Sequence, residues 1–138
     1  MHQQTTIANT VTHTGVGLHS GGEVTIRLKP APVDTGVVFV RVDLPGRPEV
    51  PAVAASVTST IRATTIGTDE VKVFTIEHLL SALHALRVDN CFIEIDAEEP
   101  PVADGSSLIF FDLIKQAGIR QQDKLRQEIV IDKVYRID

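Results

Sequence analysis

The sequence predicts an α+β domain, in which two helices cover one face of a β-sheet and a small additional β region lies near the N-terminal half. Before residue 75, apolar and polar residues alternate in several segments, which is typical of half-buried strands. From Thr75 onward, apolar residues recur every three or four positions, which is typical of a helix. With 138 residues, the chain is long enough to bury a core of its own.

The N-terminal part predicts strands joined by turns. Residues 15–22 (GVGLHSGG) are dense in glycine and indicate a tight turn. Pro30 and Pro32 end the segment after it, because proline cannot donate a hydrogen bond to a sheet. The strands that these signals predict cover residues 5–12, 23–30, 36–43, 62–66 and 71–74.

The C-terminal part predicts two helices on either side of a strand. The first helix has Thr75 as its expected N-cap and ends before Asp89 and Asn90. Residues 91–97 (CFIEIDA) alternate and predict the strand. Ser106 or Ser107 is the expected cap of the second helix, and Gly118 is its expected end.

The final residues, EIVIDKVYRID, are strand-like. We therefore expect residues 1–125 to form the α+β domain and residues 126–138 to be the first strand of a truncated second domain.

Composition excludes several classes of protein. The formal net charge is −5, with no basic cluster and 4% aromatic residues, so a nucleic-acid partner is not expected. A single cysteine, Cys91, excludes a disulfide framework, and within a strand it is expected to be a small buried hydrophobe. The sequence contains no apolar run long enough for a transmembrane segment and no secretory signal, so a cytoplasmic location is expected.

The strongest chemical signal is Glu77-His78 in the first turn of the predicted helix. The partial positive charge of a helix N-terminus favours a carboxylate and a neutral imidazole, and zinc binds neutral imidazole. The carboxylate could then accept a proton from a metal-bound water. The alternative from the residues alone is that Glu77 only complements the helix dipole and His78 is a partly exposed flanking residue. The pair does not match the HExxH pattern of zinc proteases.

Two further segments have a structural and a functional interpretation. The glycines of residues 15–22 suggest a phosphate-binding loop, but their spacing fails the GxGxxG pattern, so tight turning is the better explanation. The Asp104-Gly105-Ser106 triplet could hold a polar ligand, although a turn that leads into a helix cap is its commoner use.

Six motifs in this order and spacing resemble the N-terminal domain of the UDP-3-O-acyl-N-acetylglucosamine deacetylase family of lipid A biosynthesis. They are TGVGLHSG (14–21), LKPAPVDTG (28–36), RATTIG (62–67), TIEHLLSAL (75–83), DNCFIEI (89–95) and PPVADGSS (100–107). The resemblance covers the chain from about Thr5 to its C-terminus.

The resemblance implies a zinc-dependent enzyme that hydrolyses the N-acetyl amide of a UDP-linked, 3-O-acylated glucosamine. It implies His78 as a zinc ligand and Glu77 as the general base. It also implies substrate-binding roles for His19, Arg62, Ala63 and Thr64, and Ala63 stands where many members have cysteine.

The family's fold is a pair of similar α+β domains with the active site between them, and this chain resembles only the first. The family's remaining zinc ligands and its acid histidine belong to the second domain. The partners implied are therefore the UDP-sugar substrate and a C-terminal domain of the same enzyme. Because a catalytic zinc normally has three protein ligands, we expect the 138-residue chain alone to bind zinc weakly and to lack turnover.

Two other functions remain open at this point. The chain could be a binding or scaffold module that kept the domain and lost the chemistry. It could also be part of a bifunctional protein in which the deacetylase is fused to a hydroxyacyl-ACP dehydratase.

Overall fold

The computed structural model describes residues 2–137 and confirms the predicted α+β class. Its main sheet has the strand order β2-β3-β9-β4-β5. The strands are β2 (Val11–Val16), β3 (Glu23–Pro30), β9 (Cys91–Ile95), β4 (Val37–Arg41) and β5 (Glu49–Pro51). Adjacent strands are antiparallel except β4 and β9, which are parallel. The predicted strand at residues 91–97 is thus the central strand of the sheet.

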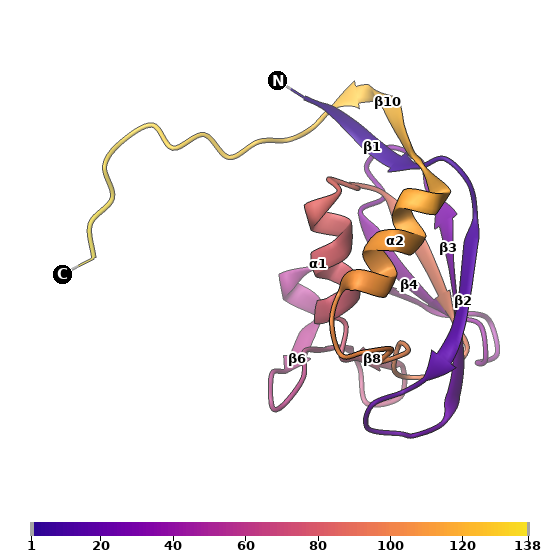
Figure 1. The fold of residues 1–138 in the computed structure, drawn as a ribbon. Helices are drawn as coiled ribbons and strands as arrows, with labels where there is room; N and C mark the ends of the chain where they lie inside the picture. Colours follow the sequence, from indigo (N-terminus) through magenta and orange to yellow (C-terminus); the bar gives the residue numbers. More distant parts are fainter. Residues whose placement is uncertain (1, 138) are drawn as a thin grey trace.

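Two helices, α1 (Glu77–Ala85) and α2 (Leu108–Ala117), lie side by side on one face of this sheet (Figure 1). Their apolar stripes face the strands, as the three- and four-residue spacing predicts. Gly118 ends α2 at a φ of 77°, in the left-handed region that favours glycine. The largest side chains buried between the layers include Ile26, Phe39, Leu79, Leu83, Ile93, Ile95, Phe110 and Ile114.

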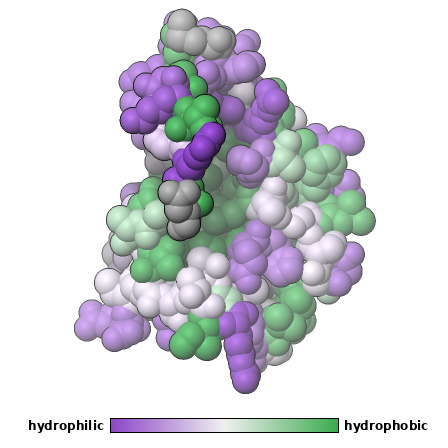
Figure 2. Space-filling view, turned by 90° about the vertical axis from the view of Figure 1, so that its left-hand side faces the viewer, coloured by the Kyte–Doolittle hydropathy of each residue, from purple (hydrophilic) through white to green (hydrophobic). Residues whose placement is uncertain are grey.

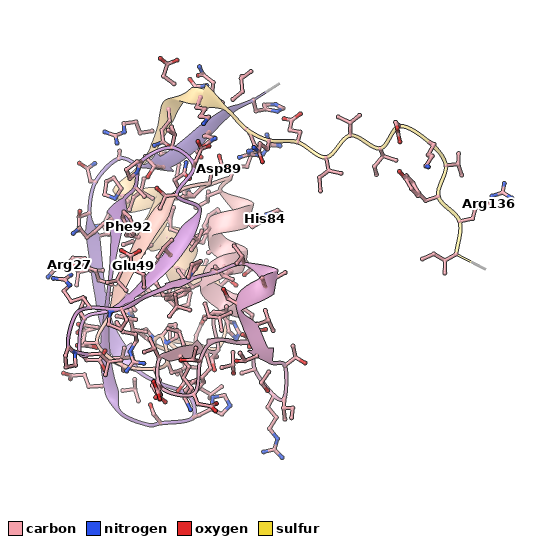
Figure 3. All side chains as sticks on the ribbon, turned by 180° about the vertical axis from the view of Figure 1, so that it is seen from behind. Arg27, Glu49, His84, Asp89, Phe92 and Arg136 are labelled. Atoms are coloured by element: carbon pink, nitrogen blue, oxygen red, sulfur yellow. The ribbon has the colours of Figure 1, made fainter. Side chains whose placement is uncertain are left out.

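The opposite face of the sheet carries a charged cluster beside apolar side chains such as Val40 and Phe92. Glu94 of β9 is nearly buried there, and three basic side chains from β3 and the β4–β5 loop converge on its carboxylate. Their nitrogens lie 3.6 Å (Arg27), 3.2 Å (Lys29) and 2.6 Å (Arg47) from it. Figure 3 shows Arg27, Glu49 and Phe92 on this side of the ribbon and His84 on α1 at the other. The alternation within β3 and β9 therefore separates a helix-covered face from a charged face.

The predicted additional β region is a three-stranded sheet of β6 (Val57–Ser59), β7 (Thr65–Gly67) and β8 (Lys72–Phe74), which follows a 3-10 turn at Ala54–Ser56. Arg41 ties it to the main sheet, because its nearly buried guanidinium donates to the carbonyl of Lys72 (2.8 Å) and to both carboxylate oxygens of Asp43 (2.9 and 2.7 Å). The hydrogen bonds to Asp43 raise the pKa of Arg41, and those from Arg41 lower the pKa of Asp43. This clamp fixes β8, which leads directly into α1.

A separate pair of antiparallel strands, β1 (Gln3–Ile7) and β10 (Ile119–Leu125), closes the other end of the domain. The predicted strand at residues 5–12 is wrong in its bounds, since the chain breaks between β1 and β2. The sequence did not predict β10. It is held by an amide network in which Asn90 donates to Gln4 (2.9 Å) and Gln122 (2.8 Å).

Residues 126–137 form no strand and extend away from the domain, with Arg136 near the far end (Figure 3). Their apolar side chains are exposed, for example Ile129 at 98%. The structure assigns no strand to residues 126–137, and Met1 and Asp138 lie outside the described residues. The assignment of this segment to a second domain, and of residues 1–125 to the first, stays a prediction.

Neither helix of residues 2–137 is long and apolar enough to cross a membrane.

Candidate active site

The start of α1 is set by Thr75, but not as an N-cap. The structure places Ile76 at the cap position, so the predicted role of Thr75 is wrong. Thr75 instead has a φ of 56°, in the left-handed region, where the chain turns from β8 into the helix. Its hydroxyl donates to Oε1 of Glu99 at 2.9 Å. The Thr75 side chain thus contacts a distant carboxylate, and the helix start has no side-chain cap.

Glu99 lies in the loop between β9 and α2 and is only 1% exposed. Its Oε2 accepts hydrogen bonds from the backbone N–H groups of His19 (2.9 Å) and Ser20 (3.2 Å). Its Oε1 accepts from the Thr75 hydroxyl and lies 2.7 Å from Nδ1 of His19. The buried carboxylate therefore joins the β2–β3 turn to the junction of β8 and α1.

These hydrogen bonds keep the Glu99 carboxylate charged. Burial is the largest single influence and raises the pKa of Glu99. The hydrogen bonds from His19, Ser20 and Thr75 together outweigh burial, so the pKa lies below its usual value. A buried anion that accepts several hydrogen bonds is a stable anchor for the segments around it.

The glycines of residues 15–22 serve two purposes. Gly21 has a φ of 64° and makes the tight turn that the sequence predicts. Gly17 gives space to the carboxylate, because a Cβ there would lie 2.7 Å from Oε2 of Glu99. A Cβ at Gly15 would lie 2.8 Å from Cβ of Pro101. The turn therefore does cradle an anion, and that anion is the side chain of Glu99.

Glu77 and His78 are the first two residues of α1, and both are partly exposed. Oε2 of Glu77 accepts a hydrogen bond from the backbone N–H of Thr64 at 3.3 Å. This bond brings the loop between β6 and β7 against the helix start. The backbone of His78 is held from the other side, since its carbonyl accepts from the Ser81 hydroxyl at 2.9 Å.

The other predicted site residues lie around the same helix end. Thr64 contacts Glu77, as described, and Ala63 beside it is partly buried. Arg62 is exposed in the β6–β7 loop, at a φ of 62°. His19 lies in the β2–β3 turn, with Nδ1 3.3 Å from the Thr75 hydroxyl.

The Asp104-Gly105-Ser106 triplet is a turn that leads into α2, as the commoner interpretation predicts. Asp104 accepts from the N–H (2.9 Å) and hydroxyl (2.7 Å) of Ser106, whose oxygen accepts from the N–H of Leu108 (3.1 Å). The hydrogen bonds from Ser106 are the main cause of a lowered pKa at Asp104, and the charge of His78 contributes least.

Sequence analysis missed Glu99 and the contact made by Thr75. The available signal was the pair of glycines at positions 15 and 17, because glycine within a strand often marks a close approach by another segment. The identity of that segment depends on the fold, since Glu99 lies 80 residues from His19.

Across residues 2–137, no group of three or more His, Cys, Asp or Glu side chains is placed to hold one metal ion. His78 and Glu77 nevertheless have the chemistry that a zinc site uses, namely an imidazole ligand and a neighbouring carboxylate base. The described residues thus fit one part of such a site.

A family model described as UDP-3-O-acyl N-acetylglycosamine deacetylase matches residues 4–138. The chain belongs to this deacetylase family. A curated UDP-3-O-acyl-N-acetylglucosamine deacetylase of Hahella chejuensis is 50% identical over 133 residues, which are 96% of this chain and 44% of that protein. The same enzyme of Marinobacter nauticus is 46% identical over 138 residues, or 100% of this chain and 45% of that protein.

A third relative, the bifunctional enzyme LpxC/FabZ of Chlorobaculum tepidum, is 50% identical over 133 residues, or 96% of this chain and 28% of that protein. The chain therefore spans less than half the length of these relatives, and the alignments cover almost all of the chain.

The close approach at Gly17 predicts the effect of a matched pair of substitutions. Gly17→Ala places a methyl group 2.5 Å from Oγ of Ser20 and 2.7 Å from Oε2 of Glu99, whereas a Cβ at Gly22 has only the Ser20 hydroxyl near it, at 3.8 Å. We expect Gly17→Ala to lower the free energy of unfolding by about 2 kcal/mol. Gly22→Ala should change it by less than about 0.5 kcal/mol. Urea denaturation measures both, and equal effects would show that the close packing of Ser20 and Glu99 around Gly17 does not require glycine there.

Proposed function

We propose that the chain supplies the general base and one zinc ligand of an enzyme that hydrolyses the N-acetyl amide of a UDP-3-O-acyl-N-acetylglucosamine, the committed step toward lipid A. The observation that carries this proposal is the position of Glu77 and His78. They are adjacent at the start of α1, and the carboxylate of Glu77 accepts a hydrogen bond from Thr64. Membership of the deacetylase family supports the reaction class.

In this proposal, His78 is a zinc ligand, and the other protein ligands come from a part of the enzyme that the chain does not cover. Zinc, when bound, supplies Lewis acidity toward the acetamide carbonyl and makes a bound water a stronger acid. The family membership and the imidazole-carboxylate pair support zinc as the cofactor.

Glu77 is the proposed general base. Its carboxylate accepts a proton from the attacking water, which leaves the oxygen free to form a bond with the acetamide carbon. The hydrogen bond from Thr64 engages one carboxylate oxygen, Oε2, so that oxygen fixes the orientation and Oε1 is available to the water. The bond between the acetamide carbon and the sugar nitrogen then breaks, the nitrogen takes up the proton that the water gave up, and acetate and the free amine of the sugar are released.

The proposed substrate contacts surround this pair. The β6–β7 loop offers the exposed guanidinium of Arg62 to an anionic group of the substrate, together with Ala63 and Thr64. The β2–β3 turn offers the half-exposed ring of His19, whose side chain is 41% exposed. These two loops lie on either side of the helix start.

A second domain is the proposed partner of the helix layer. Figure 2 faces the side of the molecule on which α1 lies, and green apolar surface lines the hollow at its centre. Leu108, at the start of α2, is 58% exposed. Exposed apolar surface of this kind is common where domains pack together.

We also propose a cytoplasmic location. Cys91 is a buried free thiol, and burial raises its pKa to about 12, so it is neither paired nor reactive. An unpaired structural cysteine suits a reducing compartment.

One observation favours a second arrangement. The relative of Chlorobaculum tepidum carries a bifunctional name, so the protein that contains this chain could also join a deacetylase to a hydroxyacyl-ACP dehydratase. The length of the open reading frame after Asp138 distinguishes this arrangement from a deacetylase alone.

The proposed role of Glu77 predicts a variant that loses turnover and keeps its zinc. In the complete enzyme, Glu77→Gln should lower kcat by about 100-fold or more, because the amide cannot accept the proton. The zinc content should stay unchanged, because Glu77 is not a proposed ligand. Glu70→Gln, an exposed carboxylate in the β7–β8 turn, is the matched control and should retain full activity. Normal turnover of Glu77→Gln would contradict the assignment.

The incomplete ligand set predicts weak zinc binding by the 138-residue chain alone. Titration calorimetry should show no tight stoichiometric site, because only His78 is in place. The same preparation should have no deacetylase turnover. A tight one-to-one complex that is lost in His78→Ala would instead show that this chain holds a complete site.

A further inference from the structure

The contact between His19 and Glu99 has a chemical consequence for the histidine ring. The backbone N–H groups of His19 and Ser20 and the Thr75 hydroxyl donate to the Glu99 carboxylate, which in its charged form has no hydrogen and acts only as an acceptor. Nδ1 of His19, at 2.7 Å from Oε1, must therefore carry the hydrogen of that bond. In the neutral ring, Nε2 is then the nitrogen with the free lone pair.

The ring is also fixed in orientation. It meets the ring of Phe74 edge to face, with centroids 5.8 Å apart and an interplanar angle of 66°. Phe74 is the last residue of β8, and Thr75 follows it at the turn into α1. The His19 ring thus packs against Phe74 and its Nδ1 contacts Glu99, while the side chain as a whole remains 41% exposed.

The position of this ring relates it to the proposed active site. The Thr75 hydroxyl donates to the same oxygen of Glu99 that faces His19. Thr75 lies two residues before Glu77 and three before His78. The partly exposed His19 side chain therefore lies beside the helix end from which both proposed site residues start.

We propose that Glu99 is a positioning residue that holds His19 as the Nδ1–H tautomer and presents Nε2 as a hydrogen-bond acceptor to the substrate. The matching group is a donor, either a hydroxyl or an N–H of the sugar nucleotide. This inference rests on the proposed deacetylase function. It assigns a role to Glu99, which makes no contact with substrate and acts only through His19.

A purely structural role for Glu99 is the competing explanation, since the carboxylate also fastens the β2–β3 turn. Glu99→Gln separates the two. The amide oxygen can replace Oε2 and still accept from the N–H groups of His19 and Ser20. The amide NH₂ then faces Nδ1 of His19, which must become an acceptor, so the ring proton moves to Nε2. The variant keeps the hydrogen bonds to the turn, and Nε2 of His19 changes from a hydrogen-bond acceptor to a donor.

The tautomer is measured by nitrogen-15 NMR of the histidine rings of the zinc-free chain. We expect the wild type to show His19 protonated at Nδ1 and Glu99→Gln to show it protonated at Nε2, with a similar melting temperature. Glu98→Gln is the matched control, because that exposed carboxylate contacts Lys72 only at 3.9 Å. A wild-type ring protonated at Nε2, or the same tautomer in both proteins, would overturn the proposal.

The effect on substrate is measured in the complete enzyme by a double-mutant cycle. Glu99→Gln and His19→Ala should each lower kcat/KM by about tenfold, the value of one hydrogen bond. In the His19→Ala background, Glu99→Gln should change kcat/KM by less than about twofold, because Glu99 acts through the His19 ring. Equal effects of Glu99→Gln in both backgrounds would mean a structural role only. If the wild-type enzyme has no deacetylase activity, the proposed function itself fails and this inference falls with it.

Discussion

The buried carboxylate of Glu99 is the interaction on which the proposed site depends. It joins three segments that lie far apart in the sequence, namely the β2–β3 turn, the start of α1 and the loop after β9. A buried charge is stable only when hydrogen bonds replace its hydration, and the turn and Thr75 supply those bonds. The contact also depends on Gly17, where a Cβ would lie 2.7 Å from Oε2 of Glu99, and it includes Thr75, whose backbone is left-handed.

The position of Glu77 and His78 follows from the same arrangement. The Arg41 guanidinium holds β8 against the main sheet, and Thr75 then turns the chain into α1. The first residues of the helix therefore have little freedom relative to the two loops that flank them. A base and a metal ligand need this kind of rigid support, since their geometry must be in place before the substrate binds.

Sequence analysis succeeded where the pattern was long and local. The central strand β9 and both helices follow from strict apolar periodicity, and Gly118 marks the end of α2 as expected. Strand β10 was missed because it is polar and depends on pairing with β1 and on amide contacts to Asn90. The N-cap prediction failed because Thr75 has a left-handed backbone (φ 56°) in place of the extended conformation typical of an N-cap. Glu77 and His78 are proposed from their chemistry and the family resemblance, whereas the contacts of Glu99 depend on residues that only folding brings close to it.

The account's central claim is that the imidazole of His78 holds a divalent ion beside the Glu77 carboxylate. Replacement of this ring by alanine in the complete enzyme, followed by parallel measurement of sugar-amide hydrolysis and bound zinc, tests that claim most directly. The account predicts that both are lost while the melting temperature of the apoprotein stays close to that of the wild-type apoprotein. Hydrolysis at the wild-type rate after the replacement would contradict it.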